Sequence, residues 1–199
     1  MDLFTLKGKT AAVIGAASGI GEAVALGCAR QGARIICLDV NEGAARAVAE
    51  RAVGEGGQAE SSGLDIRDAA AVDRVFADLD AKYGVDIAIC TPSINVRKPI
   101  LQYTDEELSR VLDVNIKGNF NVLRAAGRVM TARKQGSIVL FSSVRSQVVE
   151  PGQGAYAATK AGIVQLARAA AAFLTTSSPA GITSLPMPSP AITATRAKC

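Results

Sequence analysis

The sequence predicts an α/β fold: a Rossmann-like, doubly wound parallel sheet in a single domain. Strand candidates are short, continuously apolar segments, as expected for strands buried on both faces: residues 10–15, 34–39, 59–65, 85–90 and 136–142. Helical patterns separate them, near residues 19–31, 41–53, 68–82, 104–131 and 154–173. Regular alternation of strands and helices is typical of a parallel sheet covered on both sides, with its ligand at the carboxyl ends of the strands.

The first strand candidate leads directly into a glycine-rich turn, Gly15-Ala16-Ala17-Ser18-Gly19-Ile20-Gly21, which opens the first helix. A strand, a glycine turn and a helix in this order indicate a dinucleotide site. Gly15 permits the tight turn, Gly19 lets the backbone approach a diphosphate, and Gly21 lets the helix pack close to the strand. A glycine turn with only a structural role is the alternative.

Asp39 ends the second strand candidate. A carboxylate at this place can accept hydrogen bonds from both hydroxyls of an adenosine ribose, and it repels a 2′-phosphate. No Lys or Arg stands at Val40 or in the glycine turn to bind such a phosphate. The sequence therefore predicts NAD rather than NADP. The alternative is an acidic residue that opens the next helix near Asn41.

Tyr156 and Lys160 are four residues apart in a helical segment, so they share one face of that helix. A free phenol has a pKa of about 10, and a neighbouring ammonium stabilises the phenolate. Such a pair can transfer protons at neutral pH. Ser143 lies at the carboxyl end of the fifth strand candidate, where ligands bind in open α/β sheets. An ordinary surface Tyr and Lys is the alternative.

Asn115 falls on the apolar stripe of the helix that opens with a capping box at Thr104. A polar side chain on a buried helix face needs hydrogen-bond partners. Asn115 is therefore either a satisfied core residue or part of a site.

These features together resemble the short-chain dehydrogenase/reductase family over residues 6–173. The resemblance implies catalytic roles for Asn115, Ser143, Tyr156 and Lys160. It also implies a set of residues that hold the cofactor: Gly15, Ser18, Gly19, Ile20, Gly21, Asp39, Asp65, Ile66, Cys90, Tyr156 and Lys160. Asp65 and Ile66 match the pair that contacts adenine, and Cys90 stands at the first position of the family's Asn-Asn-Ala-Gly motif.

The activity implied by this resemblance is NAD-dependent interconversion of a secondary alcohol and a ketone. Tyr156 would be the acid/base group, Ser143 would position the substrate oxygen, and Lys160 would assist Tyr156 and hold the nicotinamide ribose. Asn115 would organise a water between Lys160 and solvent. The resemblance also implies a homodimer or homotetramer. Two other classes stay open: a catalytically silent dinucleotide-binding domain and a dimerisation remnant.

Composition agrees with such an enzyme. The chain has 199 residues, 49% of them apolar, a net charge of +4 and no histidine. No basic cluster indicates nucleic acid, no apolar segment indicates a membrane span, and no signal peptide is evident. The cysteines lack metal or redox spacing. We therefore expect a cytoplasmic protein that acts on a small molecule, without a metal site.

Three departures from the family pattern stand out. Ile14 replaces the Thr that usually precedes the first glycine, and Cys90-Thr91-Pro92-Ser93 replaces Asn-Asn-Ala-Gly. From Ala169 to Thr195 there is no charged residue, and Pro, Ser and Thr are frequent. We therefore expect a domain at 1–173 followed by an irregular, low-charge tail at 174–199, as in a truncated or altered carboxyl terminus that lacks the last strands.

Arg145 follows Ser143 closely, and Arg97-Lys98 follow the fourth strand candidate. Loops at this end of the sheet set specificity. Either these cations are solvated surface residues, or Arg145, with Arg97, binds a carboxylate or phosphate of an anionic substrate.

Overall fold

The structure is a computed structural model that describes residues 4–176 and 194–195. Within these residues it contains a six-stranded sheet with the order β3-β2-β1-β4-β5-β6. Its strands are β1 (Thr10–Ile14), β2 (Arg34–Asp39), β3 (Gln58–Gly63), β4 (Ile87–Cys90), β5 (Ser137–Leu140) and β6 (Ala194–Thr195). The first five strands are parallel, and β6 pairs antiparallel with β5.

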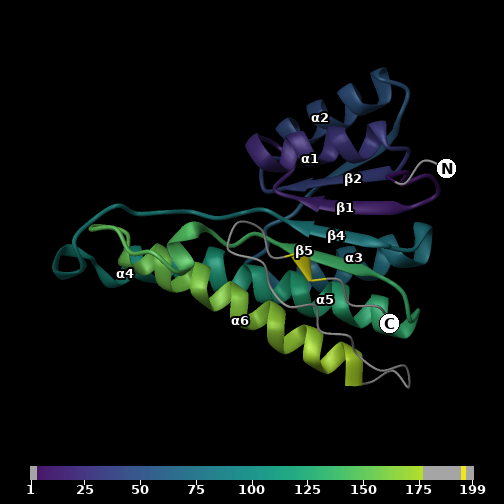
Figure 1. The fold of residues 1–199 in the computed structure, drawn as a ribbon. Coiled ribbons are helices and arrows are strands. Elements are labelled where there is room, and N and C mark those ends of the chain that lie inside the picture. Colours follow the sequence, from purple (N-terminus) through teal and green to yellow (C-terminus); the bar gives the residue numbers. More distant parts are fainter. Residues whose placement is uncertain (1–3, 177–193, 196–199) are drawn as a thin grey trace.

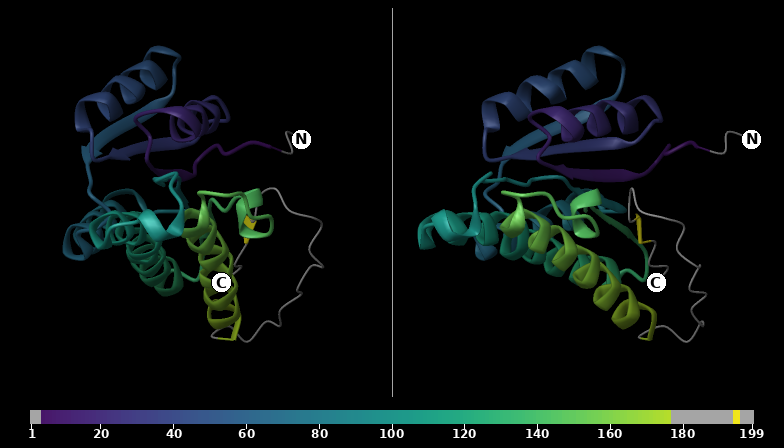
Figure 2. Two further views of the ribbon diagram at one scale, coloured as in Figure 1. Left: turned by 90° about the vertical axis from the view of Figure 1, so that its left-hand side faces the viewer. Right: turned by 60° about the vertical axis from the view of Figure 1, so that its left-hand side comes forward.

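The helices cover both faces of this sheet (Figures 1 and 2): α1 and α2 on one face, and α3, α5 and α6 on the other. Their bounds are α1 (Gly19–Arg30), α2 (Glu42–Gly54), α3 (Ala69–Tyr83), α4 (Asp105–Leu112), α5 (Asn119–Ala132) and α6 (Gly154–Thr176). Three short elements complete the set: the 3₁₀ turns η1 (Ile100–Gln102) and η3 (Val144–Ser146) and the π-helical turn η2 (Asp113–Gly118). The predicted doubly wound α/β fold is confirmed.

Alternation along the strands divides the core into two layers. Ala11 and Val13 of β1 face the layer shared with α1 and α2. Ala12 and Ile14 face the layer shared with α3, α5 and α6. All four side chains are almost completely buried, which explains why β1 is continuously apolar, whereas the edge strand β3 is mostly polar and partly exposed.

Side-chain caps begin several helices where the sequence predicts them. Asn41 accepts a hydrogen bond from Ala44 N–H, and Asp68 accepts bonds from the first turn of α3. Thr104 and Glu107 form a reciprocal capping box at the start of α4. Each cap satisfies backbone donors that the first helical turn leaves unpaired.

The long helix predicted at 104–131 is divided by η2. A π turn shifts the hydrogen-bonding register by one residue and frees backbone groups, and such turns are frequent at functional sites. Here the Asn119 side chain donates to the Val114 carbonyl, which helps to stabilise the turn. Asn115 lies inside η2.

The carboxyl-terminal part differs in two details from the sequence-based expectation. Helix α6 continues to Thr176, beyond the predicted boundary at 173, and Ala194–Thr195 pairs with the edge of β5. No strand pattern indicated β6, because two residues are too few to show alternation. The rest of the predicted irregular tail at 174–199 lies outside the described residues. None of the described helices has the length and apolar content needed to cross a membrane.

The order of the strands positions the site. β2 and β4 flank β1, so the chain winds away from β1 in opposite directions. At this reversal the connections after β1 and β4 diverge and leave a crevice at the carboxyl end of the sheet.

We expect Phe76→Ala to lower the free energy of unfolding by about 3–5 kcal/mol, because Phe76 is fully buried between α3 and the sheet. Urea denaturation followed by circular dichroism measures the change. Leu101→Ala is the control, since Leu101 is 98% exposed and should shift stability by less than about 0.5 kcal/mol. Equal losses in the two variants would contradict the described core.

Candidate active site

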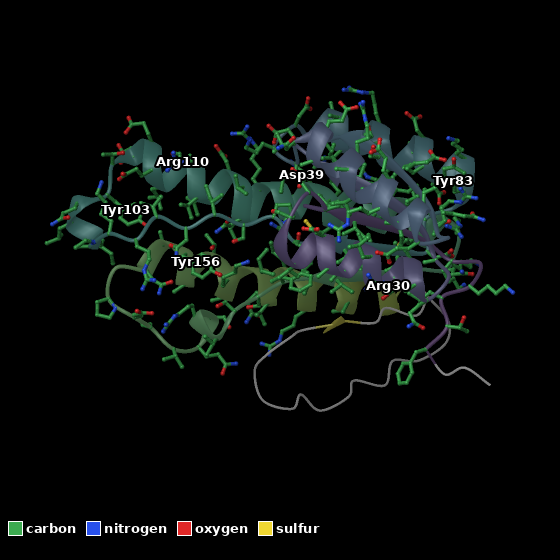
Figure 3. All side chains as sticks on the ribbon, turned by 90° about the horizontal axis from the view of Figure 1, so that it is seen from above. Arg30, Asp39, Tyr83, Tyr103, Arg110 and Tyr156 are labelled. Carbon is green, nitrogen blue, oxygen red and sulfur yellow. The ribbon has the colours of Figure 1, made fainter. Side chains whose placement is uncertain are left out.

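A cleft of about 670 Å³ opens at the carboxyl ends of β1, β2 and β4. Figure 3 labels three residues of its wall: Arg110 and Tyr156 lie on the side of the molecule away from Tyr83, and Asp39 lies between them and Tyr83. The predicted site residues that line the cleft are Gly15, Ser18, Gly19, Ile20, Gly21, Asp39, Asp65, Ile66, Tyr156 and Lys160. The fold thus brings most of the predicted site together.

The glycine turn is held tightly against its neighbours. Gly15 has φ +82°, and a Cβ there would lie 2.3 Å from Thr91 Oγ1. A Cβ on Gly21 would lie 1.9 Å from the Gly15 carbonyl oxygen. The N–H groups of Gly15 and Ala16 donate to the Leu38 carbonyl, which ties the turn to β2. Both glycines are therefore required by contact.

The amino terminus of α1 is open towards the cleft. Ser18 is the N-cap residue, and its side chain forms no capping hydrogen bond. A Cβ on Gly19 would meet no atom within 4 Å, so space remains in front of the helix. The first N–H groups of α1 and its positive dipole end can therefore receive an anion. This geometry fits the diphosphate of a dinucleotide.

Asp39 is fixed at the edge of the cleft by two backbone donors. Ala17 N–H donates to Oδ2 at 3.1 Å and Asn41 N–H donates to Oδ1 at 2.9 Å. Each carboxylate oxygen has a further acceptor site, so the group can still bind ribose hydroxyls. The next residue, Val40, is exposed and uncharged.

Asp65 already has a partner in the cleft wall. Arg67 donates to both carboxylate oxygens through its guanidinium and to Oδ1 through its N–H. The Arg67 side-chain hydrogen bonds hold the pKa of the Asp65 carboxyl below its usual value. Ile66 is buried against Gly118 of η2.

Lys160 is buried beside Tyr156. Its ammonium donates to the Phe141 carbonyl at 2.9 Å and lies 5.5 Å from the centroid of the Tyr156 ring. Ser142 Oγ donates to the Lys160 carbonyl, which joins the end of β5 to α6. Burial lowers the pKa of Lys160, whereas the nearby Cys90 thiol acts in the opposite direction.

Cys90 itself is buried at the end of β4, and burial raises the pKa of its thiol to about 12. It is therefore a neutral thiol at physiological pH. Three of the predicted site residues, Cys90, Asn115 and Ser143, are not among the described residues that line the cleft. Cys90 and Ser143 are direct chain neighbours of the lining residues Thr91 and Ser142.

Asn115 connects the loop after β4 to α6. Its side chain accepts from Ile94 N–H and donates to the Ile94 carbonyl, both at 2.8 Å, and it also donates to Thr159 Oγ1. Thr159 in turn donates to the Tyr156 carbonyl. Asn115 thus has its partners, as its 1% exposure requires.

Ser143 precedes η3 and caps it. Its Oγ accepts from Arg145 N–H at 3.2 Å, and its carbonyl accepts from the Ser146 hydroxyl. An acceptor bond of this kind leaves the hydroxyl hydrogen of Ser143 free to donate.

The structure adds cleft residues that the sequence alone did not single out as ligands, among them Thr91, Pro92, Arg67, Arg110 and Val114. Helical spacing could have found Arg110, since it precedes Val114 by four residues and shares its face. Arg67 follows directly after Asp65 at the end of a strand. Thr91 could have been found only by knowing that β4 lies beside β1.

The three cations considered for an anionic substrate all have protein partners. Arg97 donates to Glu150 Oε1 at 2.8 Å, and Arg145 pairs with Oε2 of the same carboxylate. Lys98 pairs with Glu107 at 2.7 Å. They are therefore neither unpaired surface cations nor free receptors for a substrate anion.

Comparison with known proteins agrees with this geometry. The family model described as short chain dehydrogenase matches residues 9–195. The chain is 38% identical over 168 residues to oxidoreductase UcpA of Escherichia coli K12, covering 83% of this chain. It is 36% identical over 164 residues to 2,3-dihydro-2,3-dihydroxybenzoate dehydrogenase of Bacillus subtilis, covering 82% of this chain. It spans 64% and 63% of the length of these two relatives, respectively.

A solved structure shares the fold. The gluconate 5-dehydrogenase of Burkholderia cenocepacia J2315, in complex with NADP and tartrate, has a TM-score of 0.82 at 33% identity. The match covers 85% of this chain and 67% of that one.

We expect Gly21→Ala to weaken binding of a nicotinamide dinucleotide about ten- to a hundredfold, because the added Cβ displaces the turn whose N–H groups face the anion. Titration of NADH fluorescence measures the affinity. Gly27→Ala is the matched control in the same helix, where a Cβ meets no atom within 4 Å. Unchanged affinity in the Gly21 variant would show that the turn does not bind the diphosphate.

Proposed function

Because the chain belongs to the short-chain dehydrogenase family, we propose that it is an NAD-dependent oxidoreductase that interconverts a secondary alcohol and a ketone. The observation that carries this proposal is one cleft that holds both halves of such a site. The glycine turn and Asp39 line it at one end, and Tyr156 and Lys160 line it at the other. Open α/β sheets bind dinucleotides in this position.

Asp39 supports NAD as the cofactor. Its carboxylate faces the place of the adenosine ribose, where a 2′-phosphate would bring two negative groups together. Arg67 is in the same wall, but its guanidinium is bonded to Asp65. The related gluconate 5-dehydrogenase binds NADP, so the preference of this chain rests on its own residues.

Each group at the catalytic end has a distinct role in the proposal. The bound nicotinamide supplies or accepts the hydride. Tyr156 exchanges a proton with the substrate oxygen, and the buried Lys160 ammonium near its ring stabilises the phenolate. Ser143 donates its free hydroxyl hydrogen to the same substrate oxygen and so orients it.

Asn115 holds the geometry between these parts. It binds the backbone of Ile94 in the cleft wall and Thr159 on α6, one residue before Lys160. We place it in the proton relay as the residue that organises a water between Lys160 and solvent.

The protein would act in the cytoplasm as a homodimer or homotetramer. Leu108, Leu112 and Phe120 support an oligomer, because these apolar side chains on α4 and α5 are about 40% exposed.

A silent dinucleotide-binding domain is the second candidate, because the cofactor end of the cleft is built independently of the residues proposed to catalyse the reaction. NADH titration followed by a dehydrogenase assay with secondary alcohols separates the two. Binding with turnover supports the enzyme, and binding without turnover supports the silent domain. Absence of binding would favour a role in subunit association alone.

We expect Asp39→Ala to weaken NAD binding about ten- to a hundredfold, the usual cost of losing a charged acceptor. In the same background, Val40→Arg should raise affinity for NADP. Fluorescence titration with NADH and NADPH measures both. Glu55→Gln is the control for general charge loss, because Glu55 pairs with Arg30 and does not line the cleft. NAD affinity that does not change in Asp39→Ala would overturn the assignment of the ribose site.

We expect Tyr156→Phe to lower turnover about a hundred- to ten-thousandfold while NADH still binds, because the ring remains and the transferable proton is lost. Steady-state kinetics and NADH titration measure the two effects separately. Tyr103→Phe serves as the control, since that hydroxyl donates to the Val96 carbonyl away from the cleft wall. Full activity of the Tyr156 variant would exclude it as the acid/base group.

A further inference from the structure

Glu150 joins three segments that surround the catalytic residues. One carboxylate oxygen accepts from Arg97 and the other pairs with Arg145. Oε2 also accepts from Gln153 Nε2 at 2.6 Å. Glu150 is therefore bonded to the loop after β4, to η3 and to the residue that precedes α6.

This cluster lies next to both catalytic groups along the chain and through hydrogen bonds. Arg145 donates its backbone N–H to Ser143 Oγ, so its side chain and the catalytic hydroxyl belong to the same turn. Gln153 stands three residues before Tyr156, about one helical turn away. Gln153 also accepts from Asn95, the neighbour of Ile94 in the cleft wall. Arg97, Arg145 and Glu150 are not among the residues that line the cleft, but through these links they adjoin its substrate end beside Ser143.

The Arg145–Glu150 pair is less exposed than an ordinary surface ion pair, with side chains 28% and 34% exposed, whereas the Arg97 side chain is 64% exposed. Exposed pairs are weak because water and ions screen them. Here the buried Gln153 amide holds the carboxylate, and the Lys98 N–H donates to the Gly152 carbonyl to join the two loops. The carboxylate of a substrate would have to displace the Glu150 carboxylate from the two guanidinium groups. Because Glu150 belongs to the same chain, its effective concentration beside them is high.

We infer that Glu150 is a specificity-determining residue: it occupies Arg97 and Arg145 and so favours an uncharged secondary alcohol over one that bears a carboxylate. The inference rests on the proposed function, because it concerns the substrate of that site. An uncharged polyol needs no guanidinium, since hydroxyl and backbone groups can bind it. A hydroxy acid would need an unpaired guanidinium fork for bidentate binding.

The test compares two ligands with the same carbon chain, threitol and tartrate, which differ in charge. Each is titrated by calorimetry into protein saturated with NADH, in which an alcohol cannot be oxidised. We expect Glu150→Gln to raise tartrate affinity about tenfold, because it frees two guanidinium groups, and to leave threitol affinity within about twofold. Adding Arg145→Gln to Glu150→Gln should remove the gain.

Two controls make the result specific. Glu150→Gln is nearly isosteric, and a thermal melt checks that it folds. Glu55→Gln changes the net charge equally and frees Arg30 at the carboxyl end of α1, the end opposite the glycine turn, so it should leave tartrate affinity unchanged. If tartrate binds Glu150→Gln no better than the unaltered protein, or if Glu55→Gln gives the same gain, the inference is wrong. Loss of the proposed function is seen separately, as absence of turnover or of NADH binding in the unaltered protein.

Discussion

The close approach of α1 to β1 is the constraint on which the site depends. Because Gly21 has no Cβ, the helix starts against the Gly15 carbonyl, at a distance that any other residue would prevent. That approach directs the first N–H groups of α1 into the crevice at the reversal of strand order. The turn also brings Ala17 N–H to Asp39, so one contact positions both the amino terminus of α1 and the Asp39 carboxylate at the cleft.

A second constraint acts at the opposite wall, where an ammonium group is buried. Removing a lysine from water is costly, and the structure offsets the cost only partly, with one carbonyl acceptor from Phe141. The pKa of Lys160 is lowered as a result. A cation held in this way acts on the adjacent Tyr156 ring more strongly than an exposed lysine would, because little water screens it. The bond between Ser142 and the Lys160 carbonyl keeps α6 in register with the end of β5.

The sequence predicted those parts of the fold and site that depend on local order. Some site residues stand at a strand end, as the glycine turn and Asp39 do, and others at a helical spacing, as Tyr156 and Lys160 do. Their positions in the fold therefore follow from the sequence pattern. Contacts between distant segments were not predictable in this way. Glu150 lies in an irregular loop, and only folding brings it to Arg97, 53 residues earlier. The π turn at Asn115 was also missed, because its sequence continues an ordinary helical pattern.

Thr91 shows how the fold tolerates a departure from its family. Ile14 lacks the hydroxyl that would tie the glycine turn to the next strand, yet Thr91 Oγ1 donates to the Ile14 carbonyl at 2.9 Å from the other side. The same hydroxyl oxygen lies beside both Gly15 and Gly21. Asn119 then binds the Pro92 carbonyl and Asn115 binds Ile94, so the loop after β4 is held from η2 and α5. The hydroxyl at the end of β4 thus ties the two strand ends together although residue 14 has none.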